Sequence, residues 1–144
     1  MPTARSYFAD SQFPEDSHFG GSVKTENVIA DKSKAFALRI IRLYRYLRDE
    51  THEFTLSRQV LRSGTSIGAN VKEAILGQSP ADFYSKMNIA LKEASETEYL
   101  LELLHESDYI PDDAFQSIYA DCQEILRILM SISKTQNPGS NGSC

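Results

Sequence analysis

Cysteine and long hydrophobic runs are scarce in this sequence, and each scarcity excludes a class of protein. Only two cysteines, Cys122 and Cys144, occur among 144 residues. They give neither a disulfide framework nor a metal-ligand spacing, which favours a reducing cytoplasm. No run approaches the roughly 18 apolar residues of a membrane span, and the N-terminal stretch does not have the charged start and apolar centre of a signal peptide. We therefore expect a cytoplasmic protein without membrane contact.

The common enzyme motifs are also missing. GxGxxG, the P-loop and HExxH do not occur. The three histidines are scattered over an expected extension, a loop and a helix end: His18, His52 and His105. One Glu-x-x-His motif, 102–105, matches half of the di-iron site of ferritin-like bundles, which needs a copy on each of two helices. Leu101 and Leu104 take the inward positions there, so we expect no metal, no cofactor and no enzyme activity.

Four amphipathic segments account for most of the chain. Apolar residues recur every three or four positions over 28–48, 57–77, 80–107 and 111–135, and polar turns separate these segments. Ser79 and Pro80 are typical of a helix start, as N-cap and first helical residue. Four helices with short connections pack most simply as an all-α, up-down-up-down antiparallel four-helix bundle. Residues 28–135 are the expected bundle, preceded by a flexible extension (1–27) and followed by a disordered tail (136–144).

The expected second helix has an unusual centre. Gly64 and Gly68 lie four residues apart within it, although a glycine inside a helix costs about 1 kcal/mol relative to alanine. Two of them predict close packing against a neighbouring helix, because a missing Cβ lets another backbone approach. Asn70 lies near the same inward line and is expected to make a hydrogen bond between helices.

Charge divides the chain unevenly. The net charge is −5, but residues 28–77 carry 9 basic and 5 acidic groups, whereas residues 78–144 carry 4 basic and 11 acidic groups. Such a division indicates either a binding surface or helices that attract one another within or between subunits. The candidate nucleic-acid-binding patch consists of Arg39, Arg42, Arg45, Arg58, Arg62 and Lys72. Guanidinium groups suit bidentate phosphate contacts, but no aromatic residues are interleaved with the patch. The alternative for the arginines of the first helix is that they are solvated flanks whose stems cover the edge of the core.

The apolar faces of the first and third helices are wider than one bundle core requires. Ala37, Ile41 and Tyr44 form a second line beside the main stripe of the first helix, and Leu91, Leu100 and Leu103 do so in the third. Wide apolar faces mark interfaces, so we expect a homo-oligomer.

Three segments together resemble a known family: 57–74 (SRQVLRSGTSIGANVKEA), 81–104 (ADFYSKMNIALKEASETEYLLELL) and 117–132 (SIYADCQEILRILMSI). They are similar to the bacterial four-helix-bundle family named after 23S rRNA intervening sequences, over about 28–135. The family is similar to the accessory proteins of diversity-generating retroelements, which form pentameric rings. The chain departs from it at Leu100, where the family often has tryptophan, and in the long N-terminal extension.

The resemblance implies a homopentamer that associates with RNA or DNA and has no established enzyme activity. A protein–protein interaction scaffold without nucleic-acid binding remains the alternative, which the acidic second half of the chain favours.

Overall fold

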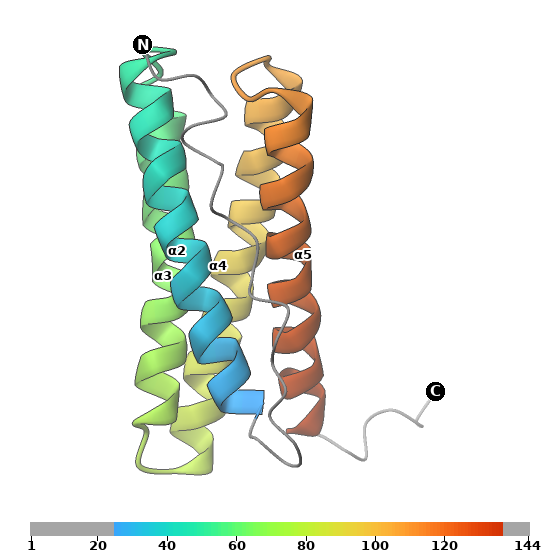
Figure 1. The fold of residues 1–144 in the computed structure, drawn as a ribbon. Coiled ribbons are helices and arrows are strands. Elements are labelled where there is room, and N and C mark those ends of the chain that lie inside the picture. Colours follow the sequence, from blue (N-terminus) through green and yellow to red (C-terminus); the bar gives the residue numbers. More distant parts are fainter. Residues whose placement is uncertain (1–24, 137–144) are drawn as a thin grey trace.

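The computed structural model describes residues 25–136, and these residues form four α-helices without a strand (Figure 1). The helices are α2 (Thr25–Asp49), α3 (Leu56–Ile75), α4 (Pro80–Glu106) and α5 (Asp112–Thr135). They run alternately up and down, and each packs on two neighbours, with α5 closing the bundle against α2. The predicted all-α four-helix fold is confirmed. No helix within 25–136 is long and apolar enough to cross a membrane.

The start of α2 differs from the sequence-based boundary. The helix begins at Thr25, three residues before the expected start, and Glu26 lies in its first turn, where a carboxylate stabilises the helix dipole. The N-terminal three residues of the helix were therefore assigned to the extension. The rest of that extension and almost all of the predicted tail lie outside the described residues.

Two different devices cap the middle helices. Ser79 caps α4 as predicted, accepting a hydrogen bond from the Asp82 backbone N–H at 3.1 Å, and Pro80 follows it. Thr55 occupies the N-cap position of α3 but makes no side-chain cap bond. The Glu53 carboxylate takes that role, because it accepts hydrogen bonds from the backbone N–H groups of Thr55, Leu56 and Ser57 at 3.1, 3.0 and 2.7 Å.

The core follows the predicted apolar lines. In α2 the main stripe of Phe36, Ile40, Leu43 and Leu47 is completely buried. The seams of α4 and α5 are also buried, apart from a half-buried Phe83 at the start of α4. Their buried members are Met87, Ala90, Ala94, Thr97, Leu101, Leu104, Phe115, Ile118, Cys122, Ile125, Leu129 and Ile132.

Several large apolar side chains stay on the surface of this bundle. Leu38, beside the second apolar line of α2, is 50% exposed, and Tyr99 on α4 is 59% exposed. Because α2 and α4 do not pack on each other within the described chain, these two side chains lie at opposite corners of the bundle. The six residues of the predicted second apolar lines are half-buried or, at Leu100, buried, so the exposed apolar groups of α2 and α4 are their neighbours.

Candidate nucleic-acid interface

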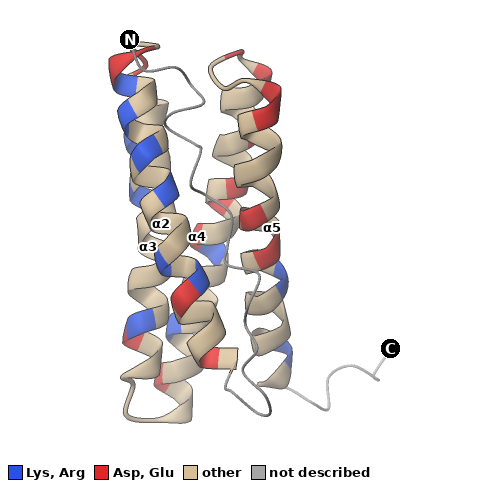
Figure 2. Cartoon of the chain, in the orientation of Figure 1, with Lys and Arg blue, Asp and Glu red and all other residues tan. Residues whose placement is uncertain are grey.

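The basic and acidic residues separate onto two halves of the bundle. Helices α2 and α3 carry 9 basic and 4 acidic residues, whereas α4 and α5 carry 4 basic and 10 acidic residues. Figure 2 shows Lys and Arg gathered along α2 and α3, and Asp and Glu along α4 and α5. We call these the basic half (α2 and α3) and the acidic half (α4 and α5).

Part of this charge holds the two halves together. Lys32 of α2 pairs with Glu124 of α5 at 2.9 Å, and Arg62 of α3 pairs with Glu93 of α4 at 3.2 Å and with Glu96. The groups that stay unpaired, rather than the total charge, therefore define any surface for an anionic partner.

Arg39 does not belong to an exposed patch, contrary to the sequence-based prediction. Its side chain is only 3% exposed and forms an ion pair with Asp121 of α5. It also donates hydrogen bonds to the carbonyl oxygen of Ser117 at 3.2 Å and to its hydroxyl at 2.9 Å. Burial raises the pKa of the Asp121 carboxyl, and the contact with Arg39 opposes that rise. Arg39 therefore joins α2 to α5 and cannot contact a phosphate without leaving the core.

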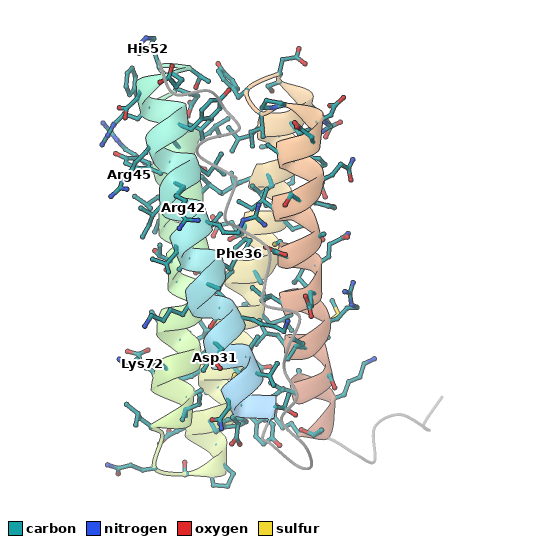
Figure 3. All side chains as sticks on the ribbon, viewed as in Figure 1. Asp31, Phe36, Arg42, Arg45, His52 and Lys72 are labelled. Atoms are coloured by element: carbon teal, nitrogen blue, oxygen red, sulfur yellow. The ribbon has the colours of Figure 1, made fainter. Side chains whose placement is uncertain are left out.

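Four of the remaining candidates form no salt bridge. Arg45, Arg58 and Lys72 are exposed and Arg42 is half-buried, and none of the four lies within salt-bridge distance of a carboxylate in residues 25–136, although the charge of Arg45 acts on Asp49. Figure 3 shows Arg42 and Arg45 in the same half of the molecule as His52, with Lys72 toward the other end. Arg58 and Lys72 are 14 residues apart in α3, about 21 Å along the helix at 1.5 Å per residue.

The end of the bundle where α2 meets α3 brings arginines and aromatic residues together. Arg45 and Arg48 lie near the C-terminal end of α2, Arg58 lies in the first turn of α3, and Phe54 lies in the connection between them. Phe54 is 49% exposed, and the guanidinium carbon of Arg48 lies 5.5 Å from the ring centroid of Tyr44. We call Tyr44, Arg45, Arg48, His52, Phe54 and Arg58 the α2–α3 end.

Sequence reasoning missed these aromatic residues. Tyr44 was assigned to a second apolar line and Phe54 to a polar connection, so the patch was described as lacking aromatic neighbours. The signal was present, because an aromatic residue in a stretch as polar as DETHEFT (49–55) has no apolar periodicity to place it in a core.

Gly64 and Gly68 lie where α3 crosses α2. A Cβ on Gly64 would lie 2.7 Å from Cγ1 of Ile40, far inside van der Waals contact. A Cβ on Gly68 would lie 3.4 Å from the carbonyl oxygen of Ser33, which is an ordinary contact distance. The two glycines therefore differ, and only Gly64 faces a side chain that would have to move.

The polar contact between helices involves other residues than Asn70. The Asn70 carboxamide donates to the carbonyl oxygen of Ser66 at 2.8 Å, within its own helix, so the expected bond between helices is not what the structure contains. Instead, the hydroxyl oxygens of Ser63 and Thr97 lie 2.9 Å apart between α3 and α4, and both residues are fully buried. The sequence placed Ser63 and Thr97 on apolar lines and did not identify this pair.

Polar side chains of the acidic half pair with one another within residues 25–136. The Tyr119 hydroxyl donates a hydrogen bond to the Glu102 carboxylate at 2.5 Å, and this bond raises the pKa of Tyr119. Nε2 of His105 lies 2.6 Å from Oδ1 of Asp112. No group of three metal-ligating side chains occurs in the part of the chain that the structure describes. Burial raises the pKa of the Cys122 thiol, which leaves it unreactive.

An open pocket of about 450 Å³ lies among α2, α4 and α5. Its lining is Thr25, Glu26, Phe83, Tyr84, Ser131, Ile132 and Thr135. Glu26 is the one acidic residue in this lining, and a lone carboxyl group offers no acid–base pair.

Comparisons with known proteins agree with this fold. The family model described as 23S rRNA-intervening sequence protein matches residues 25–131. A crystal structure of a protein with unknown function from the S23 ribosomal protein family of Bacteroides thetaiotaomicron VPI-5482 is 55% identical, with a TM-score of 0.75. The similarity covers 77% of this chain and 99% of that chain. No curated protein matches. The chain belongs to the 23S rRNA-intervening sequence protein family.

Proposed function

We propose that this protein is a non-enzymatic homo-oligomer that binds RNA or DNA through the basic half of its bundle. The observation that carries the proposal is the pair of exposed arginines, Arg45 and Arg58, toward the end of the bundle where α2 meets α3, neither of which forms a salt bridge within residues 25–136. Guanidinium groups bind phosphate oxygens bidentately, so exposed arginines on these two neighbouring helices suit a phosphate backbone. The family name, which refers to ribosomal RNA, supports the same ligand class.

Oligomerisation would give such a small site useful affinity. Each protomer offers few phosphate contacts, but a closed ring repeats them once per subunit, so that binding of one site raises the effective concentration at the next. Counterion release then makes the affinity fall steeply as salt rises.

The surface of the bundle supports a head-to-tail assembly. Leu38 lies on the basic half and is 50% exposed, whereas Tyr99 and Ile89 lie on the acidic half and are 59% and 38% exposed. Apolar groups on opposite corners, in surroundings of opposite charge, suit a contact between different faces of two copies, and such a contact closes into a ring when its rotation allows. We propose a pentamer, following the resemblance to the family.

The assembly is tested by light scattering on the full chain at micromolar concentration. We expect an oligomer for the wild type and dissociation for Leu38→Glu, because a carboxylate would be buried at the contact. Met130→Glu on α5 is the control, since Met130 is similarly exposed (49%) but lies outside the proposed contact. A monomeric wild type would contradict the proposal.

Nucleic-acid binding is tested by titrating labelled RNA and DNA at low and at physiological salt. We expect Arg45→Gln/Arg58→Gln to weaken binding to a similar degree for different base sequences, since phosphate contacts carry no sequence information. Lys92→Gln/Lys134→Gln removes the same charge from the acidic half and is expected to bind almost as the wild type does. No binding to any nucleic acid at low salt would contradict the proposal and leave the protein–protein scaffold, which the acidic surface favours.

The proposal includes a cytoplasmic location, which depends on the low cysteine content of the chain. The absence of enzyme activity is likewise part of the proposal, and the lone carboxylate in the pocket among α2, α4 and α5 supports it.

A further inference from the structure

The connection between α2 and α3 presents an exposed aromatic ring between the helices that carry Arg45 and Arg58. Phe54 is 49% exposed in a loop of six residues between Asp49 and Leu56. The ring of His52 lies 6.3 Å from it, centroid to centroid. Contact between an apolar ring and water is unfavourable, so a ligand that covers one face of the Phe54 ring would gain binding free energy.

Hydrogen bonds from the loop to the end of α2 and the start of α3 hold it in place. The Glu53 carboxylate is bonded to three backbone N–H groups at the start of α3, and the Thr51 hydroxyl donates to the Leu47 carbonyl oxygen at 2.7 Å. The backbone N–H of Glu53 donates to the same carbonyl oxygen at 2.9 Å. Phe54 therefore sits in a connection that is fixed at both ends, and a pre-ordered platform loses little entropy when a ligand binds.

Three acidic groups lie at this end, namely Asp49, a half-buried Glu50 and Glu53. Asp49 accepts hydrogen bonds from Arg48 at 2.6 and 3.1 Å, and Glu53 faces the N-terminus of α3. Arg45 in α2 and Arg58 in α3 are exposed and form no salt bridge within residues 25–136, although the pKa of the Asp49 carboxyl is lowered by its hydrogen bonds from Arg48 and also by the charge of Arg45. The three arginines of residues 45–58 equal the three carboxylates in number, so exposed guanidinium groups, rather than a net positive charge, would attract a phosphate at this end.

We infer that the α2–α3 end binds single-stranded nucleic acid, with Phe54 stacking on a base while Arg45 and Arg58 contact the flanking phosphates. This inference rests on the proposed function and names its ligand class. A base in a duplex is already stacked on both faces, so an exposed ring on a protein surface reaches only unpaired bases. Stacking acts on any base, and RNA and DNA single strands share this chemistry.

The absence of tryptophan in the chain makes a direct test available. Phe54→Trp places the sole tryptophan in the loop, and its fluorescence is quenched when a base stacks on the indole. Met130→Trp is the matched control, because Met130 is also 49% exposed but lies on α5, outside the proposed subunit contact. Each variant is titrated at low salt with single-stranded RNA, single-stranded DNA, the DNA duplex of the same sequence, and an abasic single strand of the same length.

We expect both normal single strands to quench the tryptophan of Phe54→Trp and to leave that of Met130→Trp unchanged. The duplex and the abasic strand should bind more weakly and without quenching. Phe54→Leu, which keeps apolar bulk but removes the aromatic face, should weaken single-strand binding about fivefold or more while leaving duplex binding unchanged. Its melting temperature, compared with that of the wild type, verifies that the loop still folds.

The outcomes separate this inference from the proposed function. If the abasic strand binds as tightly as the normal strand and no quenching occurs, stacking at Phe54 is refuted while phosphate binding stands. If none of the four nucleic acids binds at low salt, both the proposed function and the single-strand inference are refuted, and a protein partner becomes the explanation of the exposed ring.

Discussion

The two halves of the bundle use charge in different ways. The acidic half carries hydrogen-bonded carboxylates along α4 and α5, such as Glu102 with Tyr119, whereas the basic half has two exposed arginines, Arg45 and Arg58, that form no salt bridge within residues 25–136. Between the halves, Arg39 forms an ion pair with a carboxylate of α5, and Arg62 forms ion pairs with carboxylates of α4. On folding, the arginines of the basic half therefore divide into those that join helices and those that stay exposed to a ligand.

The seams between helices show the same contrast at the level of packing. Within the basic half, α2 and α3 approach through a glycine with no Cβ, and no ion pair joins them in the described part of the chain. Between the halves, α2 and α5 meet around a buried arginine. The α2–α3 seam therefore depends on close packing and the α2–α5 seam on an ion pair. Substitutions at Gly64 and at Arg39 should measure these two contributions to stability independently.

The largest effect is expected at Arg39. Arg39→Met leaves the Asp121 carboxylate buried without its partner, which should lower the free energy of unfolding by about 3–5 kcal/mol. Denaturant unfolding at pH 7 measures this loss. Arg39→Met/Asp121→Leu removes both charges and should regain most of it. If the double variant were no more stable than the single variant, the pair would not act as a charge pair.

The stability deficit of Arg39→Met should depend on pH. Burial already raises the pKa of the Asp121 carboxyl in the folded protein, and losing the arginine raises it further. A folded-state pKa above the unfolded-state value means that the folded state binds the proton more tightly, so the stability deficit of Arg39→Met should shrink as pH falls from 7 toward 5. A deficit that grows on acidification would contradict the buried-carboxylate explanation.

The next effect concerns the glycine seam. Gly64→Ala places a Cβ against Ile40 and should destabilise the bundle by about 1–3 kcal/mol, because Ile40 is completely buried and has no room to move. Gly68→Ala meets only ordinary contacts and should be neutral or stabilising by up to about 1 kcal/mol from helix propensity. Thermal unfolding of the two variants measures the difference. Equal effects would mean that the crossing is not closest at Gly64.

A smaller effect is expected at the polar contact between α3 and α4. Thr97→Val removes one hydroxyl of the buried Ser63–Thr97 pair and should lower the free energy of unfolding by about 1–2 kcal/mol. Ser63→Ala/Thr97→Val removes both hydroxyls, and it should lower the free energy of unfolding by less than the sum of the two single substitutions. Additive losses in a double-mutant cycle would show that the two hydroxyls do not interact.

The smallest effect is expected at Arg62. Its side chain is 54% exposed, and exposed ion pairs contribute about 0–1 kcal/mol, so Arg62→Gln should change the melting temperature little. The same substitution should leave nucleic-acid affinity almost unchanged, because Glu93 and Glu96 already neutralise the guanidinium. A large loss of affinity would show that Arg62 leaves its carboxylates to bind the ligand.

The sequence was most informative where spacing alone decides the structure. The seam from Met87 to Leu104 and the Ser79–Pro80 start predicted α4 to within one residue of its observed end, since an apolar line and a cap are local signals. The cap at Glu53 was missed because the carboxylate precedes the N-cap residue, whereas a capping box places it three residues after.

Burial of charge was not predictable from the sequence. Arg39 belongs to a three-residue arginine repeat that winds around α2, so spacing alone does not say which member faces inward. Its partner Asp121 lies 82 positions away, and only the packing of α2 on α5 brings them together. The exposed face of Phe54 likewise depends on how the loop folds over the end of the bundle.

The salt dependence of binding tests the central claim most directly, namely that the unpaired arginines of the basic half form the site. The affinity for a single-stranded oligonucleotide is measured against salt for the wild type, for Arg45→Gln/Arg58→Gln and for Lys92→Gln/Lys134→Gln. The loss of two phosphate contacts per protomer should flatten the slope of log affinity against log salt by about 0.7 for each contact in the first double variant and leave it unchanged in the second. Equal slopes in the two variants would contradict the claim, because the protein would then respond to net charge alone.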